Sequence, residues 1–217
     1  FLLEDEDTPV VWRGPIKLGA IQQFIGDVEW GELDYLVIDF PPGTSDEPLT
    51  VAQSLPDIDG MVIVTTPQQV ALLDSRKSIT FSESLKVPVL GVVENMSGFT
   101  VNGSAAPGTE VSIAAPGGKT LSATADDQGN FSVTLDIFKE GGGKDTAEEF
   151  GVPFLGALPF DPGFVRGGDD GVHRIVSEPD GASAQAFAKV VAAIQDQLSD
   201  GADSGIEIIL GGAMTEV

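Results

Sequence analysis

Residues 60–93 begin with Gly60-Met61-Val62-Ile63-Val64, continue through a helix-like segment at 69–85, and end with Val87-Pro88-Val89-Leu90-Gly91-Val92-Val93. The two short runs are apolar without alternation, which indicates strands that are buried on both faces of a parallel sheet. Parallel strands need a long crossover between them, and the intervening helix provides it. This strand–helix–strand unit predicts an α/β fold.

Two further apolar runs extend the predicted sheet. Residues 33–38 precede the central unit, and residues 152–158 follow it. Helices are predicted at residues 15–25, 48–55 and 184–198, and the last of these is amphipathic. Alternating strands and helices predict a doubly wound, mostly parallel α/β sheet.

Residues 100–136 interrupt this alternation. Three segments in this stretch alternate with period two, and Gly-, Pro- and Asp-rich turns separate them; the segments are 110–114, 120–125 and 130–135. They predict a small three-stranded antiparallel insert that is half exposed. The α/β domain would then comprise residues 1–99 and 137–198, and residues 199–217 would form a loose tail.

The charge balance is strongly acidic. The chain has 34 acidic and 11 basic residues, giving a net charge of −23, and a field of that sign repels nucleic acid. A hydrophobic content of 41% nevertheless predicts a folded core. Two interpretations remain open. In the first, the protein is adapted to high salt, which screens the repulsion between its own charges because the Debye length falls to about 3 Å at 1 M. In the second, it is an ordinary acidic protein.

Cysteine is absent and there is one histidine, His173. Disulfides and thiolate metal sites are therefore excluded within this chain. No apolar run approaches the roughly 20 residues of a membrane span, and no signal peptide is visible. We therefore expect a cytoplasmic protein without membrane contacts.

The most informative motif is Asp39-Phe40-Pro41-Pro42-Gly43-Thr44, which follows the predicted strand 33–38. Open α/β sheets bind ligands at the carboxyl ends of their strands. An Asp there can hold Mg²⁺, usually through water, and Gly43 would let backbone approach a phosphate. The alternative is a strand-end Asp that caps the next helix.

A longer series of segments resembles the Mrp-type P-loop ATPases, which carry iron–sulfur clusters. The series runs in that family's order and covers roughly residues 10–99 and 137–198. Its segments are Trp12–Pro15, Leu33–Asp46, Thr65–Asp74, Val92–Ser97, Gly141–Gly143, Gly151–Gly156 and Pro159–Pro162. The family is similar to MinD- and ParA-like ATPases.

The resemblance implies a dimer with ATP at its interface. It makes Asp39 the Mg²⁺ carboxylate, with catalytic importance, and Gly43 the phosphate-sensing glycine. Asn95 matches the residue whose amide reads the adenine edge, and an amide offers the donor and acceptor this needs. Pro159 and Asp161 match the loop that walls the adenine. For the last three residues, a simple turn role is the alternative.

The phosphate loop of the family is missing from this sequence. No G-x-x-x-x-G-K-[ST] occurs: Ile113 stands five places before Gly118-Lys119-Thr120, and Phe138 stands five places before Gly143-Lys144. The family's loop lies upstream of the segment that matches Phe1. We therefore expect a fragment that binds ATP weakly or not at all on its own, with Gly141–Gly143 opening a helix instead.

The family's Cys-x-x-Cys pair is also missing. It belongs just after the segment matching Asn95–Phe99, where the insert stands here, so the chain has no iron–sulfur ligands. The predicted function is an ATP-dependent iron–sulfur carrier or assembly factor that serves recipient apoproteins. The alternative is a non-enzymatic scaffold in which the insert replaces the cluster site and offers strand edges to a partner.

Overall fold

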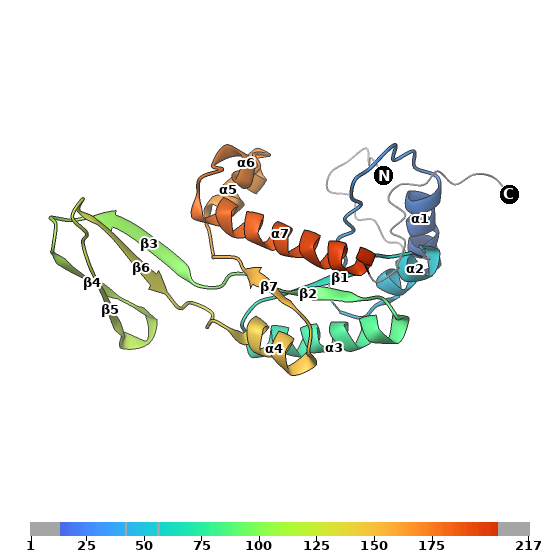
Figure 1. The fold of residues 1–217 in the computed structure, drawn as a ribbon, viewed down its shortest axis with the longest axis horizontal. Helices are drawn as coiled ribbons and strands as arrows, with labels where there is room; N and C mark the ends of the chain where they lie inside the picture. The colour runs from blue at the N-terminus through green and yellow to red at the C-terminus, as the bar shows by residue number, and fades with distance from the viewer. Residues whose placement is uncertain (1–13, 42, 56, 204–217) are drawn as a thin grey trace.

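The computed structural model describes residues 14–203 except 42 and 56. Trp12, Arg13 and Pro42 of the motifs above, and residues 204–217 of the predicted tail, lie outside the described residues. The structure contains an α/β body and a β insert that projects from one end of it (Figure 1).

A three-stranded parallel sheet forms the centre of the body, in the order β1-β2-β7. The strands are β1 (Met61–Thr65), β2 (Val89–Glu94) and β7 (Phe154–Ala157). The predictions for 60–64, 87–93 and 152–158 are therefore confirmed. The α/β class and the parallel sheet are confirmed with them.

Helices cover both faces of this sheet (Figure 1). On one face, α3 (Gln69–Leu85) and α4 (Gly142–Phe150) enclose a core in which Ile79 and Val92 are fully buried. On the other face, α7 (Ala182–Asp203) brings Val190 against Val93. Neighbouring residues of β2 thus enter opposite cores, which explains its unbroken apolar run.

Four more helices complete the described body, and all are short except the first. They are α1 (Gly14–Gly26), α2 (Asp46–Ser54), α5 (Gly163–Asp170) and α6 (Arg174–Ser177). The first two pack together at the end of the molecule opposite the insert, where Lys17 Nζ lies 3.3 Å from Glu47 Oε1 (Figure 1). Helix α7 continues through Asp203, so the predicted tail begins later than residue 199.

The prediction of a strand at residues 33–38 is wrong. These residues form no regular element, and the side chain of Val37 is 89% exposed. A strand needs a neighbour for its backbone hydrogen bonds, and none of the described strands pairs with this segment. Tyr35 instead rests near α7, where its hydroxyl accepts a hydrogen bond from Gln195 Nε2 at 3.4 Å.

The insert contains four strands, not the predicted three. The additional strand is β3 (Phe99–Ser104), which pairs antiparallel with β6 (Asn130–Leu135), while β4 (Glu110–Ala114) pairs with β5 (Thr120–Thr124). The single three-stranded sheet is therefore wrong: there are two separate two-stranded ladders. Strand β3 was missed in the sequence because Gly103 interrupts its alternation of apolar and polar residues. In the structure, the Phe131 ring fills the space that a side chain at this position would take.

A glycine in the central strand provides a test of this packing. Gly91 has φ +150°, and a Cβ at this position would lie 2.5 Å from the Pro153 carbonyl oxygen. We expect Gly91→Ala to destabilise the protein by about 2–4 kcal/mol, because backbone strain and overpacking add. Chemical unfolding measures the loss. Gly19→Ala is the matched control, since nothing lies within 4 Å of that position in α1. Equal stability of the two variants would contradict the tight packing of β2 on the β7 connection.

Candidate functional site

The carboxyl ends of the three parallel strands meet at one edge of the sheet. Asn95 N–H donates to the Thr65 carbonyl at 2.7 Å, and Leu158 N–H donates to the Glu94 carbonyl at 2.7 Å. Ser97 N–H then donates to the Leu158 carbonyl at 2.9 Å. These backbone bonds hold the loops after β1, β2 and β7 side by side, so the structure brings Asn95 together with the loop that contains Pro159 and Asp161.

Asn95 is half-buried at this edge, and one end of its amide is in use. Its Oδ1 accepts a hydrogen bond from Met96 N–H at 2.9 Å, which fixes the side chain beside its own turn. Met96 has a left-handed backbone with φ +57°. Within the part of the chain that the structure describes, Nδ2 has no hydrogen-bond partner, so the donor end of the amide can serve a ligand.

Asp161 is fully engaged in a network inside the protein. Its Oδ1 accepts from Gly163 N–H at 2.7 Å, and its Oδ2 accepts from Ser183 Oγ at 2.7 Å and from Arg174 Nε at 3.3 Å. Arg174 also pairs with Glu178. The carboxylate thereby joins the starts of α5, α6 and α7 and fixes the loop that follows Pro159.

The surroundings of Asp161 also set its pKa. Burial by itself would raise the pKa, but the hydrogen bonds from Ser183, Gly163 and Arg174 outweigh it. The pKa therefore lies below its ordinary value of 3.8. The charged form is the one that this network stabilises.

Glu94 is the last residue of β2. It belongs to the segment Val92–Ser97 that resembles the Mrp-type family, but the sequence predicts no role for it. Its side chain is 1% exposed. Oε1 accepts from Ser97 Oγ at 2.5 Å and from Gly141 N–H at 3.0 Å, and Oε2 accepts from Gly143 N–H at 2.7 Å. The sequence features that could have predicted this contact are an acidic residue at the end of a buried apolar run and three glycines at the start of a helix.

This arrangement decides what the Gly141–Gly143 run does. It opens α4, as predicted, and the exposed N–H groups of a helix start form a natural anion site. Here the anion is the protein's own Glu94 carboxylate. The run is thus used internally and does not form a phosphate loop.

Asp39 and Gly43 follow no described strand. Both are exposed and lie in the irregular segment between α1 and α2. Nearby, Thr44 lines a shallow hollow of about 450 Å³ against the second half of α3, beside Thr80 and Ser84. The expectation that Asp39 stands at a strand end fails with the strand itself, and its assignment to Mg²⁺ stays a prediction.

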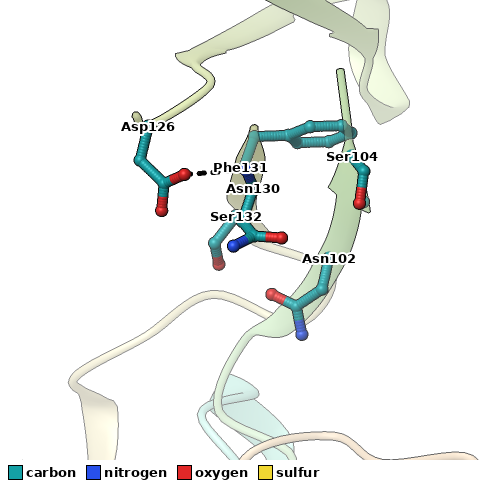
Figure 2. Close-up of a pocket in the computed structure, with 7 residues that line it drawn as sticks. Asn102, Ser104, Asp126, Asn130, Phe131 and Ser132 are labelled. Carbon is teal, nitrogen blue, oxygen red and sulfur yellow. Dashed lines mark hydrogen bonds between the residues drawn. The ribbon is translucent and has the colours of Figure 1, made fainter. Parts of the chain in front are cut away.

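Another hollow, of about 490 Å³, lies on the insert, between β3 and β6 (Figure 2). Asn102, Ser104, Asn130 and Ser132 line it with amides and hydroxyls. Its carboxylate, Asp126, is committed to a turn, because Oδ1 accepts from Gln128 N–H at 2.9 Å and Asn130 N–H at 2.8 Å. One oxygen of the only carboxylate that lines the hollow is therefore used by the turn.

Side chains that bind metal ions are not clustered in the described part of the chain. Among the residues that the structure describes, no group of three His, Cys, Asp or Glu side chains comes together. The whole sequence has no cysteine to provide a thiolate. No helix in the described ranges is long and apolar enough to cross a membrane.

Comparison with known families gives a direct match. The profile of the ParA-type family described as NUBPL iron-transfer P-loop NTPases matches residues 1–126 and 121–195. The chain belongs to this family. The two matched stretches meet inside the insert, at β5, and the Mrp-type resemblance found in the sequence is confirmed.

Individual relatives agree. An iron–sulfur cluster carrier protein of Methanocaldococcus jannaschii is 42% identical over 198 residues, which is 91% of this chain and 58% of that protein. One from Saccharolobus solfataricus is 44% identical over 190 residues, covering 88% and 55%. The chain thus spans little more than half the length of these relatives.

A solved structure supports the fold. The cell-division ATPase MinD of Pyrococcus furiosus superimposes with a TM-score of 0.52 at 18% identity, over 82% of this chain and 58% of that one. At this identity the likeness concerns the fold alone. It agrees with the expected fold of MinD-like ATPases.

The Asp161 network predicts a pH-dependent contribution to stability. Because its folded-state pKa is lowered, its contribution is present above the ordinary value of 3.8 and is lost as pH falls through the folded pKa. We expect Asp161→Asn to cost about 1–2 kcal/mol at pH 7, a difference that shrinks below about pH 4. Urea unfolding of both proteins across this range measures it.

Asp169→Asn is the matched control, because it removes one exposed negative charge from α5 without touching the network. A difference between wild type and Asp161→Asn that stays constant from pH 7 to pH 3 would show that the carboxylate charge is not what the network stabilises.

Proposed function

We propose that this chain supplies the adenine side of the nucleotide site in an ATP-dependent iron–sulfur cluster carrier. The observation that carries the proposal is the meeting of Asn95 with the Pro159–Asp161 loop at the carboxyl edge of β2 and β7. Open α/β sheets bind ligands at this edge. Family membership and carrier relatives at more than 40% identity support the same assignment.

The chemistry of the edge suits a purine ring. Asn95 presents an Nδ2 donor without a described partner, while its Oδ1 is held by Met96. Pro159 adds an apolar surface, and the Asp161 network keeps its loop in place. ATP bound here would supply the phosphoryl group whose transfer drives the carrier cycle, and the chain's own residues would orient the base.

The phosphate side of the site is weaker in this chain. Asp39 and Gly43 remain the proposed Mg²⁺ and phosphate residues, but they are exposed and belong to an irregular segment that follows no described strand. Gly141–Gly143, the other candidate for phosphate, is occupied by Glu94. We therefore propose that the chain alone binds the base and holds the triphosphate poorly.

The iron–sulfur cluster is the cargo of the proposed carrier, and this chain's side chains do not fit it. Such clusters take thiolate ligands, and the sequence has none. Ser, Asn and Asp side chains of the insert are hard oxygen donors and poor substitutes. A homodimer and recipient apoproteins belong to the proposal at the family level, as does a cytoplasmic location.

The base assignment makes a sharp prediction for uncharged ligands. We expect millimolar adenosine to show saturation-transfer NMR contacts with this chain, and inosine to bind more weakly. Asn95→Asp should weaken adenosine binding about fivefold, because one donor worth about 1 kcal/mol is replaced by an acceptor while the Met96 contact survives.

Asn102→Asp is the matched control, since it makes the same exchange at an exposed position of β3. Equal binding of adenosine and inosine, or equal effects of the two variants, would remove Asn95 from the base site. Absence of any adenosine contact would overturn the proposal as a whole.

The missing thiolates lead to a second prediction. After anaerobic incubation with iron and sulfide, we expect this chain to stay without the visible charge-transfer absorbance of a cluster, because it offers no sulfur ligand. The Methanocaldococcus relative, treated in parallel, provides the comparison. A stoichiometric visible band on this chain would contradict the expectation.

One observation favours a second candidate function, a scaffold without enzymatic activity. The insert is a folded pair of β-ladders that begins at Phe99, and the family resemblance puts the cysteine pair just after the segment matching Asn95–Phe99. A folded module at that position suits protein contact, since each two-stranded ladder leaves strand edges open.

A further inference from the structure

The insert is joined to the candidate adenine edge by more than its two chain connections. Phe160, in the middle of the Pro159–Asp161 loop, donates its backbone N–H to the Gly98 carbonyl at 2.8 Å. Gly98 is the residue immediately before β3. The loop that would wall the base is therefore hydrogen-bonded to the residue that leads into the insert.

The ring of Phe160 contacts both ends of the insert. It lies 5.8 Å from the ring of Phe99, the first residue of β3, at 80°. It also lies 6.2 Å from the ring of Phe138, which follows β6, at 62°. Both arrangements are edge-to-face, the geometry in which aromatic pairs attract each other beyond simple burial.

Glu94 makes a second connection between the same parts. It stands next to Asn95, and its carboxylate binds Ser97 on the entry side of the insert and Gly141 and Gly143 on the exit side. Among the described residues no basic side chain pairs with it, so these three donors carry its buried charge. The Glu94 carboxylate and the Phe160 ring thus connect the two chain segments that lead into and out of the insert with the candidate adenine edge.

We propose that Glu94 and Phe160 are positioning residues that join the adenine edge and the β insert into one cooperative unit, so that a base bound at Asn95 would order the insert. This inference rests on the proposed function only for the identity of the ligand. The coupling itself is a property of the protein without ligand. Its consequence is that the module standing in place of the cysteine pair responds to the nucleotide site.

Hydrogen exchange of the ligand-free chain, followed by mass spectrometry, tests the coupling. In Glu94→Gln the amide must place an N–H₂ group against either Gly141 or Gly143, so one donor loses its acceptor. We expect exchange to quicken about fivefold both in residues 158–163 and in the distal parts of β3 and β6, with β1 and the buried side of α3 unchanged.

Phe160→Leu is the second variant, and it should produce the same paired change without altering any charge. Phe164→Leu is its matched control: Phe164 packs against Phe187, 5.6 Å away, and should affect only the α5–α7 region. Faster exchange confined to residues 158–163 alone, or to β3 and β6 alone, in both variants would overturn the inference. An equal rise in β1 and α3 would overturn it as well, because the two parts would then be linked only by global unfolding.

Adding adenosine to the wild-type chain separates this inference from the proposed function. Protection at 95–98 and 158–163 that extends into β3 and β6 supports both. Protection that stops at the edge overturns the coupling alone. No protection anywhere, with the paired effects of the two variants intact, overturns the adenine assignment and leaves the coupling standing.

Discussion

The buried carboxylate of Glu94 is the constraint on which the arrangement of this protein depends. An ionised group at 1% exposure is costly unless hydrogen bonds replace its water. Here Ser97, Gly141 and Gly143 replace it, and two of them belong to the start of α4, where backbone N–H groups favour a negative charge. The same bonds fix where the chain leaves the sheet for the insert and where it returns.

This constraint also favours a glycine at position 143, near the start of α4. A Cβ at Gly143 would lie 3.0 Å from Glu94 Cβ and 3.2 Å from its Oε2. A side chain at this position would therefore crowd the carboxylate and push the helix start away from it. A run that resembles part of a phosphate-binding loop in sequence is used here to bind an internal anion.

The two ends of the body differ in how tightly they are packed and hydrogen-bonded. At the insert end, the loops after β1, β2 and β7 are cross-linked by backbone hydrogen bonds, the Asp161 network and an aromatic cluster. At the opposite end, α1 has no buried residue, and residues 33–38 leave apolar side chains exposed. The residues proposed for the base lie at the first end, whereas those proposed for Mg²⁺ and phosphate lie in the irregular segment between α1 and α2.

The sequence by itself determined the family, the α/β class and the three paired strands, because apolar runs between helices require burial on two faces. The family resemblance assigned Asn95, Pro159 and Asp161 to one adenine pocket, and the absence of cysteine excluded thiolate chemistry within the chain. The tertiary structure decided the rest. Residues 33–38 have a strand's composition, but a strand exists only where another strand accepts its hydrogen bonds. The role of Glu94 arose from groups 47 and 49 residues away, and no local pattern encodes a contact at that separation.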